Sequence, residues 1–258
     1  MSQTAIDPAI PRVALVTGAA RRIGAAIAAE LAEAGFAVAL HCHASVEDAE
    51  ALSTRLPTRS VVLRGDLAVE ADVRPLIARA AAALGPVGVL VNNASRFERD
   101  EAATVTRASW DTHMEANLRA PFVLTQAFAA ALPEAVPGCV INLLDQRVWS
   151  LTPHFVSYTV SKAALWALTQ TLALALAPRI RVNGIGPGPA IASARQTAEQ
   201  FARQAGSVPL GHGTSPEEIA RAVTMILSLP AMTGQMIALD GGQHMQWHPA
   251  GDPGAIAE

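Results

Sequence analysis

The sequence is poor in cysteine, and its two cysteines do not indicate a metal site or a disulfide framework. Cys42 and Cys139 stand far apart in the chain, and neither belongs to a CxxC pair or to a cysteine–histidine spacing. Zinc sites and disulfide-rich folds need such spacings or many more cysteines. We therefore expect two small buried hydrophobic side chains and no metal.

Positive charge is also scarce. The formal net charge is −3, and no basic cluster extends beyond Arg21-Arg22. Nucleic acids and anionic membranes attract proteins through basic patches, so neither is an expected partner. The apolar run after Lys162 is interrupted by polar residues at 169–171 and ends at Pro178, too short and polar for a membrane span. The first twelve residues, MSQTAIDPAIPR, lack the basic start and apolar core of a secretory signal, which predicts a cytoplasmic protein.

What the chain does contain is an alternation of short apolar runs and alanine-rich helical segments. Parallel strands with right-handed crossover helices are the economical way to pack such a string. The sequence predicts one α/β domain, a Rossmann-like doubly wound parallel sheet with helices on both faces. Strands are expected at 13–16, 37–40, 61–63, 87–91, 140–143, 181–184 and 235–239, and helices at about 23–34, 69–84, 110–132, 157–177 and from 215 onwards.

The remaining segments are assigned by composition. Residues 1–11 are predicted to be a flexible lead-in, 12–242 the folded domain, and 243–258 a tail. The stretch 187–213 is rich in Pro, Gly and Ser, which is typical of a mobile lid or helical flap over a substrate.

A glycine turn, Thr17-Gly-Ala-Ala-Arg-Arg-Ile-Gly24, follows the first predicted strand. Gly18 allows a tight turn and Gly24 allows close helix packing, which leaves backbone N–H groups aimed at a phosphate. Arg21 and Arg22 add positive charge where an anion would lie. A solvated turn remains the alternative for these two arginines.

The end of the second strand bears on cofactor choice. An acidic residue there would bind the ribose hydroxyls and repel a 2′-phosphate, but HCHAS at 41–45 has no carboxylate. This favours NADPH, with Arg21, His43 and Ser45 as candidate partners of the 2′-phosphate. For His43, a half-buried structural histidine remains the alternative.

Tyr158 and Lys162 stand four residues apart on a predicted helix, so their side chains project from one face. A neighbouring ammonium favours tyrosinate and lowers the phenol pKa from about 10, so the phenol can exchange a proton with a substrate near neutral pH. By itself this spacing is a weak signal that occurs on helices by chance, and a solvated surface pair is the alternative that it favours.

Several motifs in order resemble the classical short-chain dehydrogenase/reductase family from about residue 12 to 242. They are TGAARRIG, GDL at 65–67, NNAS at 92–95, Asn117 in EANLRAPF, YTVSK at 158–162 and GPGP at 186–189. The resemblance implies that Tyr158 is the acid, that Lys162 contacts the nicotinamide ribose and that Asn117 holds a relay water. It implies cofactor contacts from Gly18, Arg21, Arg22, Ile23, His43, Ser45, Asp66, Leu67, Asn93, Ala94, Ser95, Tyr158, Lys162, Pro187 and Gly188.

Three departures from the usual family pattern resemble its pteridine reductase branch. Arg22 replaces the middle glycine of the first turn, Arg96-Phe97 follows NNAS, and Asp145 replaces the serine thirteen residues before the tyrosine. HCHAS also resembles the HYHRS of that branch, with Ala44 in place of its arginine. The resemblance implies substrate contacts from Arg22, Ser95, Phe97, Asp145 and Tyr158.

The chemistry agrees with that branch. Reducing a ring C=N requires protonation at nitrogen, for which an Asp–Tyr pair is a suitable donor relay, whereas a carbonyl reductase needs a neutral hydroxyl donor. We therefore expect NADPH-dependent reduction of a pterin or dihydropterin, with catalytic residues Asp145, Tyr158, Lys162 and Asn117. Asp145 as a solvent-facing loop residue and Phe97 as core packing are the alternatives for those positions.

Two other functions remain open. One is a short-chain reductase acting on a sugar, steroid or 3-oxoacyl carbonyl. The other is a noncatalytic NADPH-binding regulator, which would not need Tyr158, Lys162 and Asn117. The family resemblance also implies a homotetramer. In the tail, which carries His244, Trp247 and His248, Trp247 either closes a neighbouring subunit's pocket or lies in a disordered segment.

Overall fold

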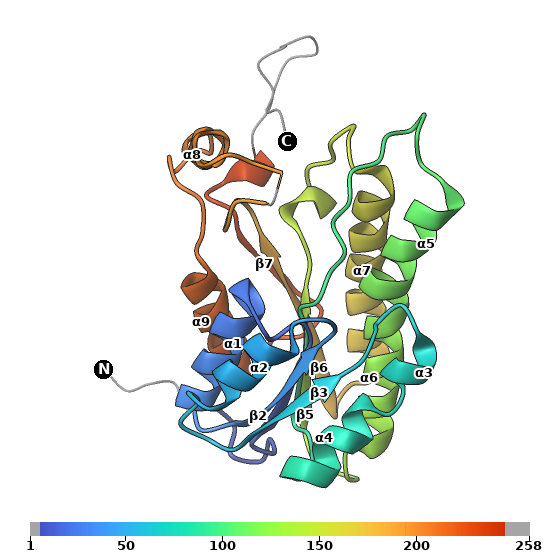
Figure 1. Cartoon of the computed structure of the whole chain (residues 1–258). Helices are drawn as coiled ribbons and strands as arrows, with labels where there is room; N and C mark the ends of the chain where they lie inside the picture. Colours follow the sequence, from blue (N-terminus) through green and yellow to red (C-terminus); the bar gives the residue numbers. More distant parts are fainter. Residues whose placement is uncertain (1–5, 194, 246–258) are drawn as a thin grey trace.

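Seven parallel strands form one sheet at the centre of the molecule (Figure 1), as predicted. The computed structural model describes residues 6–193 and 195–245. The strand order is β3-β2-β1-β4-β5-β6-β7, so the direction of winding reverses between β1 and β4. The strands are β1 Val13–Val16, β2 Ala37–Cys42, β3 Ser60–Arg64, β4 Val89–Asn92, β5 Gly138–Leu143, β6 Ile180–Pro187 and β7 Met236–Leu239. Ligands of open α/β sheets bind outside the carboxyl ends of the strands at this reversal.

Helices cover both faces of the sheet. Figure 1 shows α1, α2 and α9 on one side and α4, α6 and α7 on the other. The helices are α1 Arg22–Glu33, α2 Val46–Ser53, α3 Glu70–Val73, α4 Leu76–Leu84, α5 Arg107–Met114, α6 Ala120–Ala131, α7 Val156–Ala175, α8 Ala198–Gly206 and α9 Pro216–Leu227. Short helical turns lie at η1 Glu115–Arg119, η2 Gln146–Val148 and η3 Gln243–Met245.

The strand side chains divide between two cores according to their alternation. In β1, Ala14 and Val16 pack into the core under α1 and α9, whereas Val13 and Leu15 pack into the core under α4 and α6. Successive strand residues point to opposite faces, and both faces of a parallel sheet are covered. Continuous apolar runs are the result, and they made the strands easy to locate in the sequence.

Two of the predicted helices are wrong in extent. The segment predicted as a helix at 69–84 forms α3 and α4, which are separated at Arg74 and Pro75, because proline has no N–H to continue the first helix. The segment predicted at 110–132 begins earlier, at Arg107, with a Thr106–Ser109 capping box. It is then interrupted by the π-helical turn η1.

A further helix was missed. The eight residues of α2 are mostly polar and alanine, so they give a weak apolar period.

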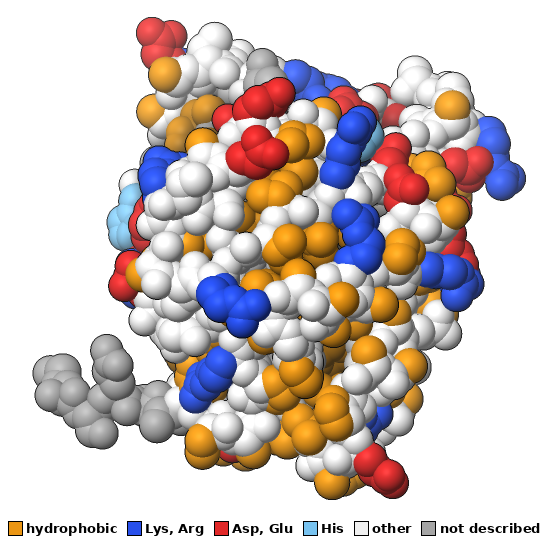
Figure 2. Space-filling model, turned by 60° about the horizontal axis from the view of Figure 1, so that its bottom comes forward, with side chains coloured by type: hydrophobic (Ala, Val, Ile, Leu, Met, Phe, Trp, Pro, Cys, Tyr) orange, Lys and Arg blue, Asp and Glu red, His pale blue; other side chains and the backbone are white. Residues whose placement is uncertain are grey.

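The surface at the bottom of the Figure 1 view is turned forward in Figure 2. On it, basic and acidic side chains lie scattered among hydrophobic ones. Across residues 6–193 and 195–245, no helix combines the length and apolar character needed to cross a bilayer.

Candidate active site

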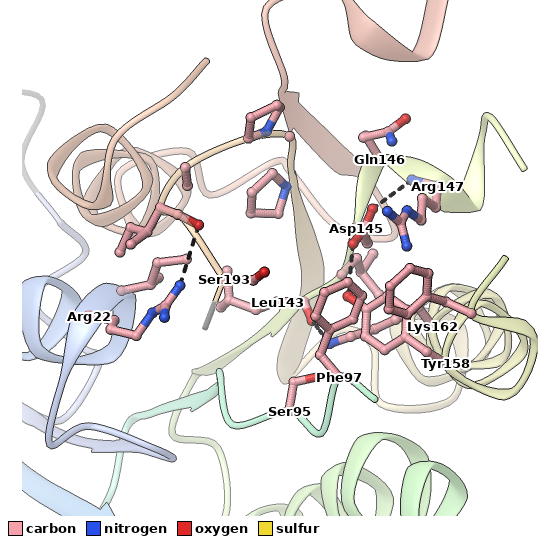
Figure 3. Close-up of a pocket in the computed structure, with 18 of the residues that line it drawn as sticks. Arg22, Ser95, Phe97, Leu143, Asp145, Gln146, Arg147, Tyr158, Lys162 and Ser193 are labelled. Atoms are coloured by element: carbon pink, nitrogen blue, oxygen red, sulfur yellow. Dashed lines mark hydrogen bonds between the residues drawn. The ribbon is translucent and has the colours of Figure 1, made fainter. Parts of the chain in front are cut away.

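A cavity of about 250 Å³ opens at the carboxyl ends of the central strands. Its walls come from the turn after β1, the segments after β4 and β5, the first turns of α7, and the flap that follows β6 (Figure 3). Four cationic side chains, Arg22, Arg147, Lys162 and Arg195, line it against one carboxylate, Asp145, among the described residues. The lining therefore suits an anionic or electron-rich ligand.

Asp145 points into this cavity and not to solvent. It is the N-cap of η2, where its Oδ1 accepts a hydrogen bond from the Arg147 backbone N–H at 2.9 Å. The cap fixes the carboxylate, so that Oδ2 accepts a 2.8 Å hydrogen bond from the Tyr158 hydroxyl (Figure 3). The alternative of a solvent-facing loop residue is thereby removed for Asp145.

Lys162 lies one helical turn beyond Tyr158, with its ammonium 5.9 Å from the centroid of the phenol ring. It is buried, and its Nζ donates a 2.7 Å hydrogen bond to the carbonyl of Leu143 at the end of β5. Burial lowers the pKa of this lysine to about 8, against the opposing effect of the Asp145 charge. Tyr158 is the only tyrosine of the chain and Lys162 its only lysine.

Asn117 lies in the π-helical turn and is fully buried. Its Oδ1 accepts hydrogen bonds from the Arg96 N–H at 2.7 Å and from the Ser95 hydroxyl at 3.2 Å. Its Nδ2 donates to the Arg96 carbonyl at 2.9 Å and to the Ser161 hydroxyl at 3.0 Å. The side chain therefore ties the segment after β4 to α7 and does not face the cavity.

Phe97 lines the cavity but already has an aromatic partner. Its ring stacks on Phe155 with centroids 4.5 Å apart and meets Tyr158 edge-on at 4.7 Å. The guanidinium carbons of Arg147 and Arg195 lie 5.5 and 5.1 Å from its centroid. Phe97 thus both packs against protein and faces the site. Phe155, Arg147 and Arg195 were not predicted as site residues, because no local sequence motif marks them.

The predicted phosphate turn has the expected form. Gly18 has φ +63°, and a Cβ at Gly24 would lie 2.1 Å from the Gly18 carbonyl oxygen. Asn93 Nδ2 supports the turn with hydrogen bonds to the carbonyls of Thr17 and Gly18 at 2.8 and 3.2 Å. Only glycine fits both positions, so the turn stays tight and its N–H groups remain at the sheet edge.

His41 connects this turn to the next one along the edge. Its Nδ1 accepts from the Gly18 N–H at 3.2 Å, so its Nε2 carries the proton and donates to the Gly65 carbonyl at 3.1 Å. Burial lowers the pKa of this imidazole to about 4, so it is neutral at physiological pH. Sequence reasoning did not select His41, although it belongs to the HCHAS segment.

The two arginines of the turn have different partners. Arg22 has φ +54°, and its guanidinium donates to the carbonyls of Ile191 and Ala192 at 3.4 and 3.1 Å, which connects the turn to the flap (Figure 3). Arg21 is exposed and pairs with Asp48 of α2, with Nε 2.5 Å from Oδ2. A role for Arg21 at a phosphate would require exchange of that ion pair.

The other predicted residues fall into groups. Ile23, Asn93, Ser95, Pro187 and Gly188 line the main cavity. His43 and Asp66, whose Nε2 and Oδ2 lie 3.7 Å apart, line a second cavity of about 300 Å³ beyond β2 and β3. Gly18, Leu67 and Ala94 pack beneath the edge, and Ser45 is the N-cap of α2 without a side-chain cap bond.

The described part of the tail folds back toward the site. His244 Nδ1 lies 2.7 Å from Asp240 Oδ2, and its ring is 5.1 Å from that of Trp149. Trp247 and His248 lie outside the described residues. Within the described ranges, no group of His, Cys, Asp and Glu side chains could hold a metal ion.

Comparison with known proteins identifies the family. A family model described as enoyl-(acyl carrier protein) reductase matches residues 18–244. The chain is 45% identical to FolM alternative dihydrofolate reductase 1 from Brucella canis, whose structure is a complex with NADP; the match covers 97% of this chain and 99% of that one with a TM-score of 0.91. The protein of the same name from Brucella suis, also in complex with NADP, is 47% identical over 94% of this chain and 98% of that one, with a TM-score of 0.90.

Other relatives have different names. A granaticin polyketide synthase putative ketoacyl reductase 2 of Streptomyces violaceoruber is 32% identical over 240 residues, 90% of this chain and 96% of the relative. The chain belongs to the short-chain dehydrogenase/reductase family of oxidoreductases, and within it is most similar to the pteridine reductase branch.

Proposed function

We propose that this protein is an NADPH-dependent reductase of a C=N bond in the ring of a pterin or dihydropterin. The observation that carries the proposal is the 2.8 Å hydrogen bond from the Tyr158 hydroxyl to Asp145 inside the cavity. A carboxyl coupled to the phenol can resupply a proton to it, which suits protonation of a ring nitrogen. A carboxylate facing the alkoxide that develops in carbonyl reduction would be unfavourable.

The site residues fit an NADPH molecule. Backbone N–H groups of the turn at 17–24, the Arg22 guanidinium and the Lys162 ammonium supply donors and positive charge for an anionic dinucleotide. Pro187 and Gly188 would flank the nicotinamide, and His43 and Asp66 the adenosine end. The cofactor, when bound, supplies the hydride. Both Brucella structures are complexes with NADP, which supports this choice.

The protein's own residues manage the proton. Tyr158 donates its phenolic proton to the substrate nitrogen. Asp145, after it takes a proton from solvent, returns that proton to the phenolate along the same hydrogen bond, which restores both groups. Lys162 limits the cost of negative charge on the phenol from a distance of 5.9 Å to its ring. The Arg147 backbone N–H holds the carboxylate in place, so no reorientation is needed during the reaction.

The walls of the cavity suit a flat heteroaromatic ring. Phe97 and Phe155 present stacked aromatic surface beside Tyr158, and aromatic pairs of this kind favour a planar ligand. The similarity to the alternative dihydrofolate reductases of Brucella supports a pterin-containing substrate. We also propose that the protein is cytoplasmic, in keeping with its two buried free cysteines. The family resemblance supports a homotetramer.

A carbonyl substrate is the second candidate, because a putative ketoacyl reductase is among the relatives. Purified protein and NADPH are mixed with a panel of dihydropterin, dihydrofolate and carbonyl compounds, and loss of cofactor absorbance is followed. We expect turnover with the pterin group and little with the carbonyl group. The reverse preference would replace the proposal with the carbonyl candidate, and cofactor binding without any turnover would favour a noncatalytic role.

A further inference from the structure

The helix that carries Tyr158 and Lys162 lacks a cap of its own. Its N-cap residue, Phe155, has φ +58° and offers no side-chain cap bond. Asp100, from the segment after β4, supplies what is missing. Its backbone carbonyl accepts from the N–H groups of Phe155 and Val156 at 2.9 and 3.3 Å, and its Oδ1 accepts from the Ser157 N–H at 3.1 Å. A remote residue therefore satisfies the first donors of α7.

The Asp100 carboxylate also ends a chain of side-chain hydrogen bonds. Its Oδ2 accepts a short hydrogen bond from the Ser157 hydroxyl, and the Ser157 oxygen lies 2.7 Å from His113 Nδ1. His113 Nε2 in turn accepts from the Glu98 backbone N–H at 3.0 Å. These partners require the neutral imidazole with its proton on Nδ1. All three side chains are buried, so the geometry is held by packing as well.

The Asp100 carboxylate is stabilised by its polar neighbours. Burial would raise the pKa of Asp100, but hydrogen bonds from Ser157 and Ser109, together with the neighbouring His113, lower this pKa overall. The carboxylate also lies at the N-terminus of a 20-residue helix, whose dipole favours negative charge there. Burial lowers the pKa of His113 and keeps this imidazole neutral. The chain is therefore a fixed hydrogen-bonded unit at neutral pH.

A second connection repeats the first, one helical turn further on. Asn117 bonds the backbone of Arg96 and the hydroxyl of Ser161, as His113 bonds the backbone of Glu98 and the hydroxyl of Ser157. Both pairs are four residues apart in the sequence. On α7, the two serines directly precede Tyr158 and Lys162.

Phe97 lies between the two anchored residues of its segment. Arg96 is held by Asn117 and Glu98 by His113, so the backbone on both sides of Phe97 is fixed to the α5–η1 helical stretch and through it to α7. The Phe97 ring meets the Tyr158 ring edge-on at 4.7 Å. The spacing between these two rings is thus set by the polar connections behind them and not by the rings alone.

We propose that Asp100, Ser157 and His113 are positioning residues, which hold the phenol of Tyr158 at the right distance from the substrate ring resting on Phe97. The inference rests on the proposed function, since it takes Phe97 to contact the substrate. None of the three lines the cavity among the described residues, so their effect passes through Tyr158 and Phe97. A misplacement of the proton donor lowers turnover more than it weakens cofactor binding.

A double-mutant cycle tests the proposal. Ser157→Ala, Phe97→Leu and the double variant are compared for kcat with a dihydropterin and for Kd of NADPH. We expect Ser157→Ala to lower kcat roughly tenfold while the Kd for NADPH changes less than about twofold. The kcat of the double variant should match that of Phe97→Leu alone. Once the Phe97 ring is removed, the spacing between it and the Tyr158 ring no longer affects turnover, so the loss of Ser157 has no further effect. If the losses in kcat of the two single variants multiply in the double variant, Ser157 has a merely structural role and the proposal is overturned.

Amide hydrogen exchange of the free protein gives a second test that needs no substrate. In Asp100→Asn, which keeps one side-chain acceptor, exchange should rise moderately at Ser157. In Asp100→Ala it should rise strongly at Ser157 and at Glu98 together, whereas Phe155 and Val156 keep the backbone carbonyl of residue 100 as their acceptor. His113→Asn, which cannot reach the Glu98 N–H, should expose Glu98 alone. Unchanged exchange at Glu98 in Asp100→Ala would refute the coupling.

Thr171→Val is the matched control, because the Thr171 hydroxyl donates to the Ala167 carbonyl at 2.9 Å on the exposed side of the same helix. It should leave kcat and exchange at both segments unchanged. If the unaltered protein turns over no pterin, the proposed function fails, and the exchange measurement still decides the coupling. If it turns over pterins and the losses multiply, only this inference fails.

Discussion

The Tyr158 hydroxyl donates a 2.8 Å hydrogen bond to Oδ2 of Asp145, whose other carboxylate oxygen caps the turn that follows β5. Oδ1 thus has a structural role as the cap, and Oδ2 is the oxygen that takes part in the proposed proton transfer. The carboxylate cannot turn away from the phenol without losing its cap. This division of labour makes Asp145 the most informative position for mutation.

Asp145→Asn should keep the cap and the fold but lose the ability to pass a proton. We expect dihydropterin turnover to fall about a hundredfold, which is the scale of a lost acid or base group, with little change in NADPH affinity. Asp145→Ser, which restores the alcohol of most family members, should lose pterin turnover similarly. Steady-state kinetics and cofactor fluorescence titration measure the two quantities. Equal loss of turnover and cofactor affinity would argue against the role.

Lys162 is the only lysine, so lysine-selective isotope labelling gives a single side-chain ammonium signal in NMR. Burial lowers its pKa to about 8 in the free protein, and we expect that signal to titrate there. The pH profile of kcat/KM for NADPH, which reports the free enzyme, should decline through the same region as the ammonium charge is lost. A signal that stays protonated up to the ordinary lysine range would contradict this prediction.

His41 should make the fold sensitive to mild acid. Burial lowers its pKa from 6.5 to about 4, so between these values the unfolded chain binds more protons than the folded one. Stability is therefore complete above pH 6.5 and falls as the pH drops toward 4, by roughly 1.4 kcal/mol per pH unit from this group. Urea unfolding across that range measures the slope.

His41→Asn is the control for that slope, since Asn retains an acceptor near the Gly18 N–H but does not titrate. Its unfolding free energy should vary less with pH than that of the unaltered protein. His113, whose pKa burial also lowers, contributes in the same direction and leaves a residual slope. An unchanged slope in His41→Asn would assign the acid sensitivity to other groups.

Arg22 occupies a left-handed backbone conformation, φ +54°, and donates to two carbonyls of the flap. Arg22→Gly relieves the backbone strain, so the free energy of unfolding should change by less than about 1 kcal/mol. The flap at 189–206 should nevertheless be cleaved faster in limited proteolysis, and the KM for substrate should rise. Arg21→Ala, which removes only the pair with Asp48, should leave the cleavage rate unchanged. If Arg22→Gly and the unaltered protein were cleaved at the same rate, the hydrogen bonds from Arg22 would not be what holds the flap in place.

The sheet and the phosphate turn could be predicted from the sequence because local patterns determine them. Strands buried on both faces read as apolar runs, such as Val13–Val16, and the turn requires glycine at 18 and 24 for steric reasons. The Asp145–Tyr158 pair was also accessible, since the two residues lie close in sequence and the family pattern marks the substitution at 145.

The contacts around Phe97 could not be predicted in this way. Arg195 donates to the Phe97 carbonyl from 98 residues away. Phe155, which stacks on Phe97, has a left-handed backbone that no sequence pattern indicated. Arg21 was expected at a phosphate, but a carboxylate on the unpredicted helix α2 pairs with it. Tertiary folding decides these contacts, and no local pattern announces them.

The π-helical turn at Glu115–Arg119 has a consequence for how such a site arises. A turn of this kind holds one residue more than the regular helix, and each helical residue advances the face by about 100°. Deleting a single residue here would swing His113 away from Ser157 while Asn117 kept its contacts. A change of chain length, and not of side-chain chemistry, would then be enough to break the connection from His113 to Ser157 and leave only that from Asn117 to Ser161.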